Sequence, residues 1–342
     1  MSRTDRESDA MRRALVLAAT PGVPQGPNPR VGCVLLAPDG AVFAEGYHRG
    51  AGTAHAEVDA LSRAGDAARG STAVVTLEPC DHTGLTGPCT QALIAAGVAR
   101  VVFAQSDPNP LAAGGAATLR AAGIEVVAGL LSAEATALNE RWSFAVTRGR
   151  PFVTWKAATT LDGRIAAADG SSRWITSADA RADVHRIRSE VDAVIVGTGT
   201  VLADDPHLAV RVGGEVDHAA RQPMRVVVGL RDLPAGARVL DDAAPTLQLR
   251  SHDPLDVLHS LFERGARHVL LEGGPTLASA FVSAGVIDAV RWYVAPALLG
   301  AGAVALAEAG MATISDALRL QVTAVTLVGG DVRIDARVLR VE

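Results

Sequence analysis

One stretch of the sequence decides how the N-terminal half folds: AVVTLEPCDHTGLTGPCTQALIAAG, residues 73–97. Its β-rich beginning, 73–77, predicts a short strand. Residues 89–96 predict a helix that Gly97 ends, because glycine readily adopts the left-handed conformation at a helix C-terminus. The loop between strand and helix runs from Cys80 to Cys89. The stretch therefore reads as a strand, a cysteine-bounded loop and a helix.

The same alternation continues on both sides of this stretch. Apolar residues at helical spacing alternate with β-rich runs, beginning with a helix and two adjacent strands. This order predicts a sheet with helices packed on its faces. The expected helices cover 5–20, 55–64, 89–96, 111–122 and 132–146, and the expected strands cover 31–36, 41–47, 73–77, 100–104 and 124–127.

A short segment, 147–151, interrupts the alternation with two arginines, a glycine and a proline. A chain of 342 residues is expected to form about two domains, and we place the boundary at this segment. The predicted domains are 1–147 and 151–342. In the second we expect strands at 152–158, 193–197, 225–229, 246–250, 268–271 and 289–295, a late strand pair at 323–328 and 331–338, and helices at 178–190, 254–264 and 275–284.

Composition and charge argue against nucleic-acid binding, membrane insertion and secretion. The net charge of −5 disfavours duplex nucleic acid as a partner, because phosphate binding requires a basic surface. No apolar run approaches the ~20 residues that span a bilayer. The first ten residues are polar and lack the apolar core of a signal peptide, which favours the cytoplasm. Three cysteines do not make a disulfide framework, so metal binding or catalysis is the better hypothesis.

Two segments carry metal-binding chemistry: His55-Ala56-Glu57 at the start of an expected helix, and the loop from Cys80 to Cys89. A catalytic zinc site takes three protein ligands and leaves a fourth position open. One imidazole and two thiolates meet that count. Glu57 would then be a proton shuttle, because a fourth protein ligand would close the site. The alternatives are cysteines that are merely buried and a structural zinc site, which would normally offer four ligands.

Together these segments match the signature of zinc nucleobase deaminases, whose metal lowers the pKa of its bound water to about 7. In that signature two residues separate the cysteines, whereas eight intervene here. From the residues alone, Asn28 would be a turn residue before a proline and His48 a surface histidine at a strand end.

The longer loop identifies a family. The first half resembles the deaminase domain of the bifunctional riboflavin-biosynthesis deaminase–reductases in segments 28–33, 46–48, 55–57 and 78–89. The resemblance implies a cytidine-deaminase-like α/β/α domain with one zinc ion per chain. It assigns zinc to His55, Cys80 and Cys89, acid–base catalysis to Glu57, and the substrate pocket to Asn28, His48 and His82. The family usually has a basic residue at the place of Leu85 and a proline at that of Gly87, which bears on how the pyrimidine or its phosphate is held.

In the second half, the residues themselves offer one phosphate-binding candidate. Glu272-Gly273-Gly274 separates an expected strand from a helix that begins at Pro275. Glycines before a helix N-terminus let the backbone approach an anion. The same residues could form only a tight turn. Gly197-Thr198-Gly199 lacks the third glycine of a dinucleotide-binding fingerprint.

The second half resembles the reductase domain of the same family in segments 156–164, 171–176, 201–206 and 271–277. The resemblance implies a dihydrofolate-reductase-like α/β domain that uses NADPH, with Lys156 and Asp204 as catalytic candidates. It assigns substrate contacts to Ser172, Asp204, Leu208, Arg211 and Glu272, and cofactor contacts to Ala158, Trp174, Thr200, Gly274, Pro275, Thr276, Leu277, Ala278, Ser279 and Ala280. Arg211 is the expected partner of the substrate phosphate, and Arg231 is a candidate for the 2′-phosphate of NADPH.

We therefore expect an enzyme that catalyses two consecutive steps of riboflavin biosynthesis. The first hydrolyses the 2-amino group of 2,5-diamino-6-(5-phosphoribosylamino)pyrimidin-4-one. The second reduces the ribosyl chain of 5-amino-6-(5-phosphoribosylamino)uracil to ribityl with NADPH. The expected partners are these small phosphoribosyl pyrimidines and further copies of the chain in a homo-oligomer. The alternatives are an enzyme acting on another pyrimidine or purine, and a zinc-stabilised regulatory protein that binds pyridine nucleotide without turnover.

Overall fold

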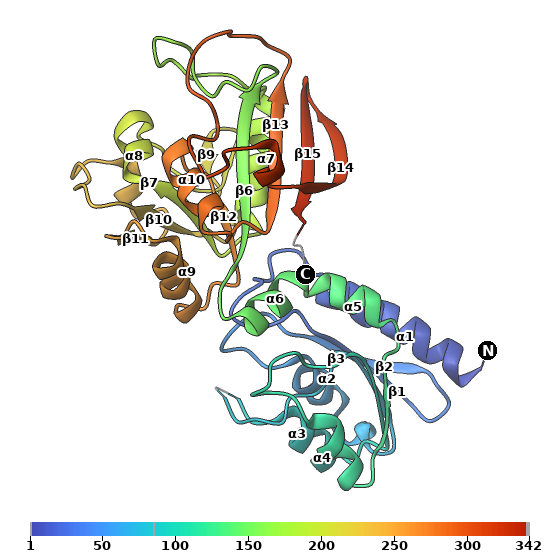
Figure 1. Ribbon diagram of the computed structural model, residues 1–342. Coiled ribbons are helices and arrows are strands. Elements are labelled where there is room, and N and C mark those ends of the chain that lie inside the picture. The colour runs from blue at the N-terminus through green and yellow to red at the C-terminus, as the bar shows by residue number, and fades with distance from the viewer. Residues whose placement is uncertain (1, 85, 340–342) are drawn as a thin grey trace. The chain divides into compact units, whose positions relative to one another are not determined.

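In the computed structural model of the chain, residues 2–84 and 86–339 are described (Figure 1). The chain divides into two compact units, Met1–Gly149 and Arg150–Glu342. Each unit has its own sheet and its own apolar core. Leu85, where the chain departs from the family pattern, lies outside the described residues.

In its described residues, the first unit is built on a five-stranded sheet in the order β2-β1-β3-β4-β5. β1 is antiparallel to β2 and β3, whereas β3, β4 and β5 run parallel. The central strand β3 is buried along almost its whole length, as expected for a β-rich run covered on both faces. The strands are β1 (Gly32–Leu36), β2 (Val42–Tyr47), β3 (Thr72–Leu77), β4 (Arg100–Gln105) and β5 (Glu125–Ala128).

Helices cover both faces of this sheet, because successive strand residues point to opposite sides. Val34 shares one core cluster with Met11 of the first helix, and its neighbour Cys33 shares another with Ala60 of the second. The expected α/β/α layering is confirmed (Figure 1). The helices are α1 (Arg3–Ala18), α2 (Ala56–Ala64), α3 (Cys89–Ala95), α4 (Gly115–Ala121), α5 (Ser132–Leu138) and α6 (Glu140–Arg148), with a 3-10 helix at Gly65–Ala68.

The prediction of one helix over 132–146 is wrong, because the helix is divided at Asn139. Asn139 has φ −104° and ψ 16°. It is both the C-cap residue of α5 and the N-cap residue of α6. Its amide side chain is 3% exposed and binds the main chain of Arg30 through two hydrogen bonds. A contact more than one hundred residues away therefore sets this boundary, which helical periodicity could not reveal.

In its described residues, the second unit is built on an eight-stranded sheet in the order β11-β10-β7-β12-β6-β13-β15-β14. The strands from β11 to β13 run parallel, and β15 and β14 complete one edge in antiparallel fashion. The strands are β6 (Phe152–Thr160), β7 (Ala193–Gly197), β10 (Met224–Val228), β11 (Thr246–Leu249), β12 (His268–Leu271), β13 (Ala289–Ala295), β14 (Leu320–Val328) and β15 (Asp331–Val338).

Helices again lie on both faces of the sheet. Helices α7 (Ala178–Ser189) and α8 (Thr198–Asp204) pack on one core, and α9 (Pro254–Glu263) and α10 (Pro275–Ser283) pack on the other. Sequence analysis missed α8 and the separate strand pair β8 (Arg211–Val212) and β9 (Glu215–Val216), because both are too short to show periodicity. Short 3-10 helices occur at Arg238–Leu240 and Ile314–Asp316.

Gly46 of β2 allows α2 to pack directly against the sheet. A Cβ atom at Gly46 would lie 2.4 Å from the carbonyl oxygen of Ala56 and 2.4 Å from the nitrogen of Ala60. Real Cβ atoms do not approach backbone this closely, so only glycine fits. This contact fixes the beginning of α2, the helix that His55 precedes and Glu57 belongs to.

Gly46→Ala is expected to destabilise the first unit by about 1–3 kcal/mol, the usual cost of overpacking a core. Thermal and urea unfolding of the full chain measure the change. Gly236→Ala is the matched control, because a Cβ atom there would meet nothing within 4 Å. Equal stability of the two variants would contradict the close packing of α2 on β2.

Candidate active sites

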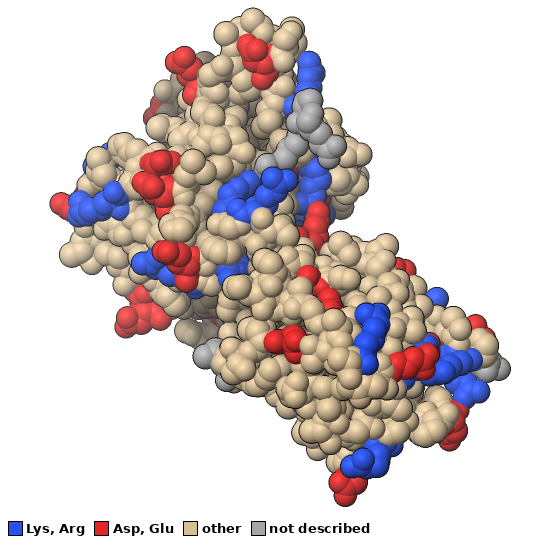
Figure 2. Space-filling model, turned by 60° about the horizontal axis from the view of Figure 1, so that its bottom comes forward, with Lys and Arg blue, Asp and Glu red and all other residues tan. Residues whose placement is uncertain are grey.

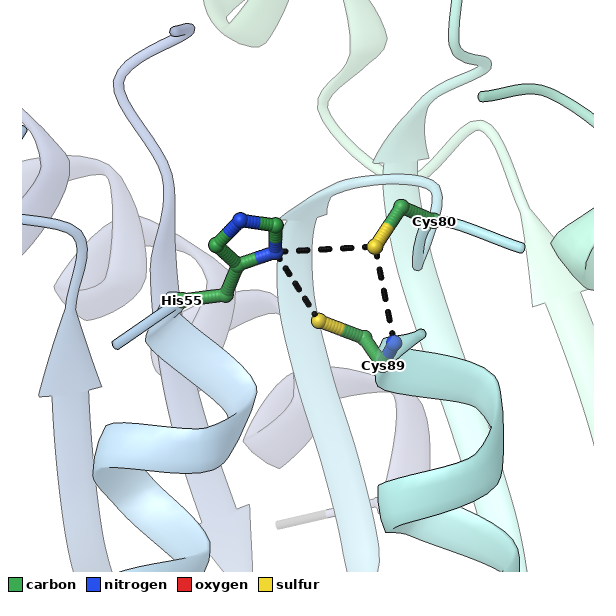
Figure 3. A group of neighbouring side chains, drawn as sticks. All are labelled: His55, Cys80 and Cys89. Atoms are coloured by element: carbon green, nitrogen blue, oxygen red, sulfur yellow. Dashed lines mark hydrogen bonds between the residues drawn. The ribbon is translucent and has the colours of Figure 1, made fainter. Parts of the chain in front are cut away.

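Three candidate metal ligands converge in the first unit (Figure 3). His55 directly precedes α2, Cys80 follows β3, and Cys89 is the first residue of α3. The Nδ1 atom of His55 lies 3.3 Å from Sγ of Cys89 and 3.5 Å from Sγ of Cys80. All three ligand atoms lie within 4.8 Å of one another, and no other described His, Cys, Asp or Glu belongs to the group.

The local backbone makes these side chains available to a metal. His55 is the N-cap residue of α2, but its side chain makes no capping hydrogen bond and faces the cysteines instead. The main-chain N–H of Cys89 donates to Sγ of Cys80 at 3.4 Å. Free N–H groups in the first turn of a helix stabilise a negatively charged sulfur.

The donor set fits zinc. The pKa of Cys80 is lowered to about 4, because the side chain of Cys89 and then His55 make hydrogen bonds to its sulfur. The pKa of Cys89 is raised, since its thiol donates to Cys80 and is buried. An imidazole and two cysteine sulfurs at this separation are ligand types of catalytic zinc, and they leave one position open.

Glu57 lies in the first turn of α2 and is 3% exposed. Burial, followed by the negative charge of Cys80, raises the pKa of its carboxyl group to about 6. A carboxyl group with a pKa near neutrality can both accept and release a proton at physiological pH. This is the property that the predicted proton shuttle requires.

Asn28 and His48 lie beside His55. The amide nitrogen of Asn28 donates to Nε2 of His48 at 3.1 Å, while Nδ1 of His48 donates to the carbonyl oxygen of Ala54 at 3.0 Å. The two contacts fix the tautomer of His48. Because a carbonyl oxygen can only accept, Nδ1 carries the proton and Nε2 is the acceptor. Burial lowers the pKa of His48, so its ring is neutral. The ring meets that of His55 edge-on, with centroids 5.2 Å apart.

The third pocket candidate, His82, is not part of this arrangement. Its side chain is exposed, and it does not belong to the group of three ligands. Two other residues near the site were missed by sequence analysis. The hydroxyl of Thr86 lies 3.2 Å from Nε2 of His55, and Asp107 follows β4 with its pKa raised to about 6 by burial. An acidic residue directly after a parallel strand was the available signal for Asp107.

A cavity of about 1040 Å³ opens in the second unit. Every substrate residue predicted for the reductase lines it, together with Lys156 and three of the predicted cofactor residues. The lining includes Lys156, Ser172, Asp204, Leu208, Arg211, Glu272, Ala158, Trp174 and Thr200. Residues from β6, α8, β8 and the end of β12 therefore meet at one place, although they are far apart in the sequence.

A buried ion pair organises this cavity. Glu272 receives two hydrogen bonds from Arg188 of α7, at 2.7 and 2.9 Å. Burial opposes ionisation of Glu272, but Arg188 and Lys156 outweigh it and lower its pKa. Burial also lowers the pKa of Lys156, partly offset by Glu272. Sequence analysis missed Arg188, because a cation in the last turn of a helix is typical of a solvated surface.

Arg211 reaches the cavity through a second contact with α7. Its main-chain N–H donates to Nδ1 of His185 at 3.2 Å. Burial and the charges of Arg188 and Arg211 lower the pKa of His185 to about 4, so this histidine is neutral. Arg188 and Arg211 both line the cavity. Two guanidinium groups at one wall favour an anionic ligand such as a phosphate.

The remaining predicted cofactor residues, 274–280, form the turn before α10 and its first turns. Gly274 is the N-cap of α10, and a Cβ atom there would lie 3.8 Å from the hydroxyl of Thr200. The N-termini of α8 and α10 are therefore neighbours at the carboxyl ends of β7 and β12. Ala278 and Ser279 are buried on the core side of α10, so their side chains do not face this surface.

The folds and sites define a class: a zinc-binding deaminase joined to a reductase. The model of the cytidine and deoxycytidylate deaminase zinc-binding region matches residues 4–105, and that of the RibD C-terminal domain matches residues 151–334. The chain is 52% identical to the riboflavin biosynthesis protein RibD of Mycobacterium tuberculosis, with 89% of each covered. It thus belongs to the RibD family of riboflavin-biosynthesis enzymes, which combine a deaminase with a reductase and use zinc and NADPH.

Solved structures agree with this assignment. The structure of Acinetobacter baumannii RibD, form 1, superposes with a TM-score of 0.88 at 38% identity, over 99% of this chain and 100% of that one. A deaminase/reductase from Thermotoga maritima superposes with a TM-score of 0.86 at 34% identity, again over 99% and 100%. The predicted family, enzyme classes and fold classes are confirmed, and the expected bifunctional enzyme is favoured over the regulatory alternative.

No helix in residues 2–84 and 86–339 is long and apolar enough to cross a membrane.

Cys80→Ser and Cys89→Ser are each expected to reduce bound zinc from one ion per chain to a small fraction of that value. Cys33→Ser is the matched control, because Cys33 is equally buried but lies in β1 outside the ligand group. Elemental analysis of the purified full chain measures the zinc content. Full zinc in both ligand variants would contradict the site.

Proposed function

We propose that residues 1–147 hydrolyse the 2-amino group of 2,5-diamino-6-(5-phosphoribosylamino)pyrimidin-4-one, and that residues 151–342 reduce the ribosyl chain of 5-amino-6-(5-phosphoribosylamino)uracil with NADPH. The observation that carries the proposal is the group of three metal ligands with buried Glu57 beside it. The second unit of the same chain has a cavity lined by the substrate residues predicted for the reductase. The Thermotoga maritima relative is described as a diaminohydroxyphosphoribosylaminopyrimidine deaminase and 5-amino-6-(5-phosphoribosylamino)uracil reductase, which supports these substrates.

In the deaminase, His55, Cys80 and Cys89 hold the metal and Glu57 moves protons. Zinc, when bound, supplies a hydroxide nucleophile at neutral pH. The carboxyl group of Glu57 takes up the two protons of the attacking water in turn and delivers one to the ring nitrogen and one to the amino group, which leaves as ammonia. Asn28 orients the pyrimidine ring by hydrogen bonds, and neutral His48 lines the pocket and holds the Asn28 amide in place. We propose that His82 joins them when substrate is bound.

In the reductase, NADPH supplies a hydride when bound. Opening the ribosyl ring to ribityl adds the hydride to the anomeric carbon and a proton to the ring oxygen that is released. Lys156 is our candidate for proton donor, since burial lowers the pKa of its ammonium group. Asp204, in the same cavity, orients the sugar. Arg211, with Arg188 on the same wall, binds the substrate phosphate.

The cofactor lies, in this proposal, along the N-termini of α8 and α10, where Thr200 and Gly274 are neighbours. Arg231 follows β10, and its side chain extends to the N-terminal turn of α8. A Cβ atom at Gly199 would lie 3.1 Å from its guanidinium nitrogen Nη2. That position supports a role for Arg231 in binding the 2′-phosphate of NADPH.

We also propose that the chain forms a homo-oligomer through β14. This edge strand is exposed over nearly all its residues, including Leu320, Val322, Val325 and Leu327. Apolar edge strands are normally covered, because their free N–H and C=O groups recruit another strand. A second copy offers the same edge and can pair with it about a two-fold axis.

We also propose that the protein is cytoplasmic and has no nucleic-acid partner. Cys33, Cys80 and Cys89 are all free, as expected in a reducing compartment. The face in Figure 2 carries acidic and basic side chains in groups of both signs, and the net charge is −5. Duplex nucleic acid would require a continuous basic surface.

Glu57→Gln is expected to reduce deamination by at least ~10²–10⁴-fold, because an amide cannot accept a proton at neutral pH. Zinc content and the reduction of the already deaminated substrate should stay unchanged. Mass spectrometry of products from the diaminopyrimidine substrate, with and without NADPH, follows both steps. Loss of zinc would make Glu57 a ligand, and wild-type chain that leaves this substrate unchanged would overturn the proposed function.

Val325→Lys and Leu327→Lys are each expected to shift the full chain from a dimer or larger assembly to a monomer. Pairing of the two β14 edges would then bury a positive charge from each copy in the same interface. Light scattering coupled to gel filtration gives the mass in solution. Val16→Lys is the control, since Val16 is comparably exposed, at 62%, but lies on α1. A wild-type monomer, or an unchanged mass in both β14 variants, would contradict this interface.

A further inference from the structure

The helix pair α5–α6 lies outside residues 4–105, the part of the chain that matches the deaminase zinc-binding region. It nevertheless holds the loop that carries Asn28. The main-chain N–H of Arg30 donates to Oδ1 of Asn139 at 2.9 Å, and Nδ2 of Asn139 donates to the carbonyl oxygen of Arg30 at 2.9 Å. One buried amide thus satisfies both main-chain groups of one loop residue.

A second side chain of α6 holds the same loop on the other side of Asn28. The indole Nε1 of Trp142 donates to the carbonyl oxygen of Pro27 at 3.0 Å, while its ring is buried in the core. The two contacts leave only Asn28 and Pro29 between fixed points. Because so short a span has little freedom, the position of the Asn28 side chain follows from the position of α6.

Two hydrogen bonds and one peptide bond connect the loop to the metal ligand His55. Asn28 donates to Nε2 of His48, and Nδ1 of His48 donates to the carbonyl oxygen of Ala54. Ala54 is joined directly to His55. Asn139 and His48 are both at least 95% buried, so each of these polar side chains depends on its hydrogen-bond partners.

We propose that Asn139 is a positioning residue of the deaminase, which sets Asn28 against the substrate through Arg30. The inference rests on the proposed function, because it takes Asn28 as a substrate contact. The break between α5 and α6 supports it. The chain interrupts the helix at the very residue that binds the loop. The α5–α6 pair is then part of the deaminase site and not a linker.

Asn139→Ala in the full chain tests this proposal against Ser143→Ala. Ser143 lies on the same helix and receives a hydrogen bond from Gln105, away from the loop. Asn139→Ala should raise the apparent KM for deamination about tenfold or more, with kcat changed less, because misplaced binding groups weaken substrate capture. Zinc content, reductase activity and both kinetic constants of Ser143→Ala should match the wild-type chain.

Two further measurements separate positioning from general destabilisation. Hydrogen–deuterium exchange of the peptide that contains Arg30 should speed up in Asn139→Ala and not in Ser143→Ala. Asn28→Ala combined with Asn139→Ala should be no worse than Asn28→Ala alone, since both act through one side chain. Should Asn139→Ala fail to fold, Trp142→Phe keeps an aromatic ring in the core, removes the hydrogen bond to Pro27 and should also raise KM.

The proposal falls if Asn139→Ala leaves KM and loop exchange unchanged, or if its effect multiplies with that of Asn28→Ala. Those results would leave the proposed function intact, because wild-type deamination is measured in the same series. Wild-type chain without deamination would instead overturn the proposed function, and this inference with it.

Discussion

The first unit depends on one geometric constraint: three metal ligands from separate segments must meet at the end of β3. Cys80 comes from the loop after that strand, while His55 and Cys89 come from the starts of two helices beside it. The helices must therefore lie very close to the sheet. Glycine makes this possible for α2, since a Cβ atom at Gly46 of β2 would lie 2.4 Å from the carbonyl oxygen of Ala56. Gly115, the first residue of α4, lets that helix approach the loop that carries Cys80, because a Cβ atom there would lie 1.8 Å from the carbonyl oxygen of Pro79.

The same constraint sets the electrostatics. Gathering ligands at helix N-termini places Cys80 among hydrogen-bond donors, and its pKa falls to about 4. Glu57 shares the buried space, so desolvation and the neighbouring sulfur raise its pKa to about 6. One packing arrangement thus yields an ionised ligand and a carboxyl group that can exchange protons near neutrality, two opposite pKa shifts within one site.

The second unit gathers its polar residues around a cavity. Parallel strands deliver polar residues to one edge of the sheet, and helices that begin there offer free N–H groups to an anionic cofactor. Burial of Lys156 and Glu272 would be costly in isolation. The bidentate contact from Arg188 offsets that cost for Glu272 and leaves Lys156 facing the cavity.

The sequence by itself determined the local features of this protein. Strand and helix order, the segment 147–151, and the residue types for zinc followed from periodicity, turn residues and ligand chemistry, because each depends on neighbours in the chain. The tertiary structure alone decided the helix break at Asn139, the pairing of Arg188 with Glu272 and the burial of Asp107. It also decided that β14 is exposed, whereas its apolar residues predict only a strand. Each of these features depends on residues that are distant in the sequence. Local sequence patterns do not indicate which distant residues will be in contact in the folded protein.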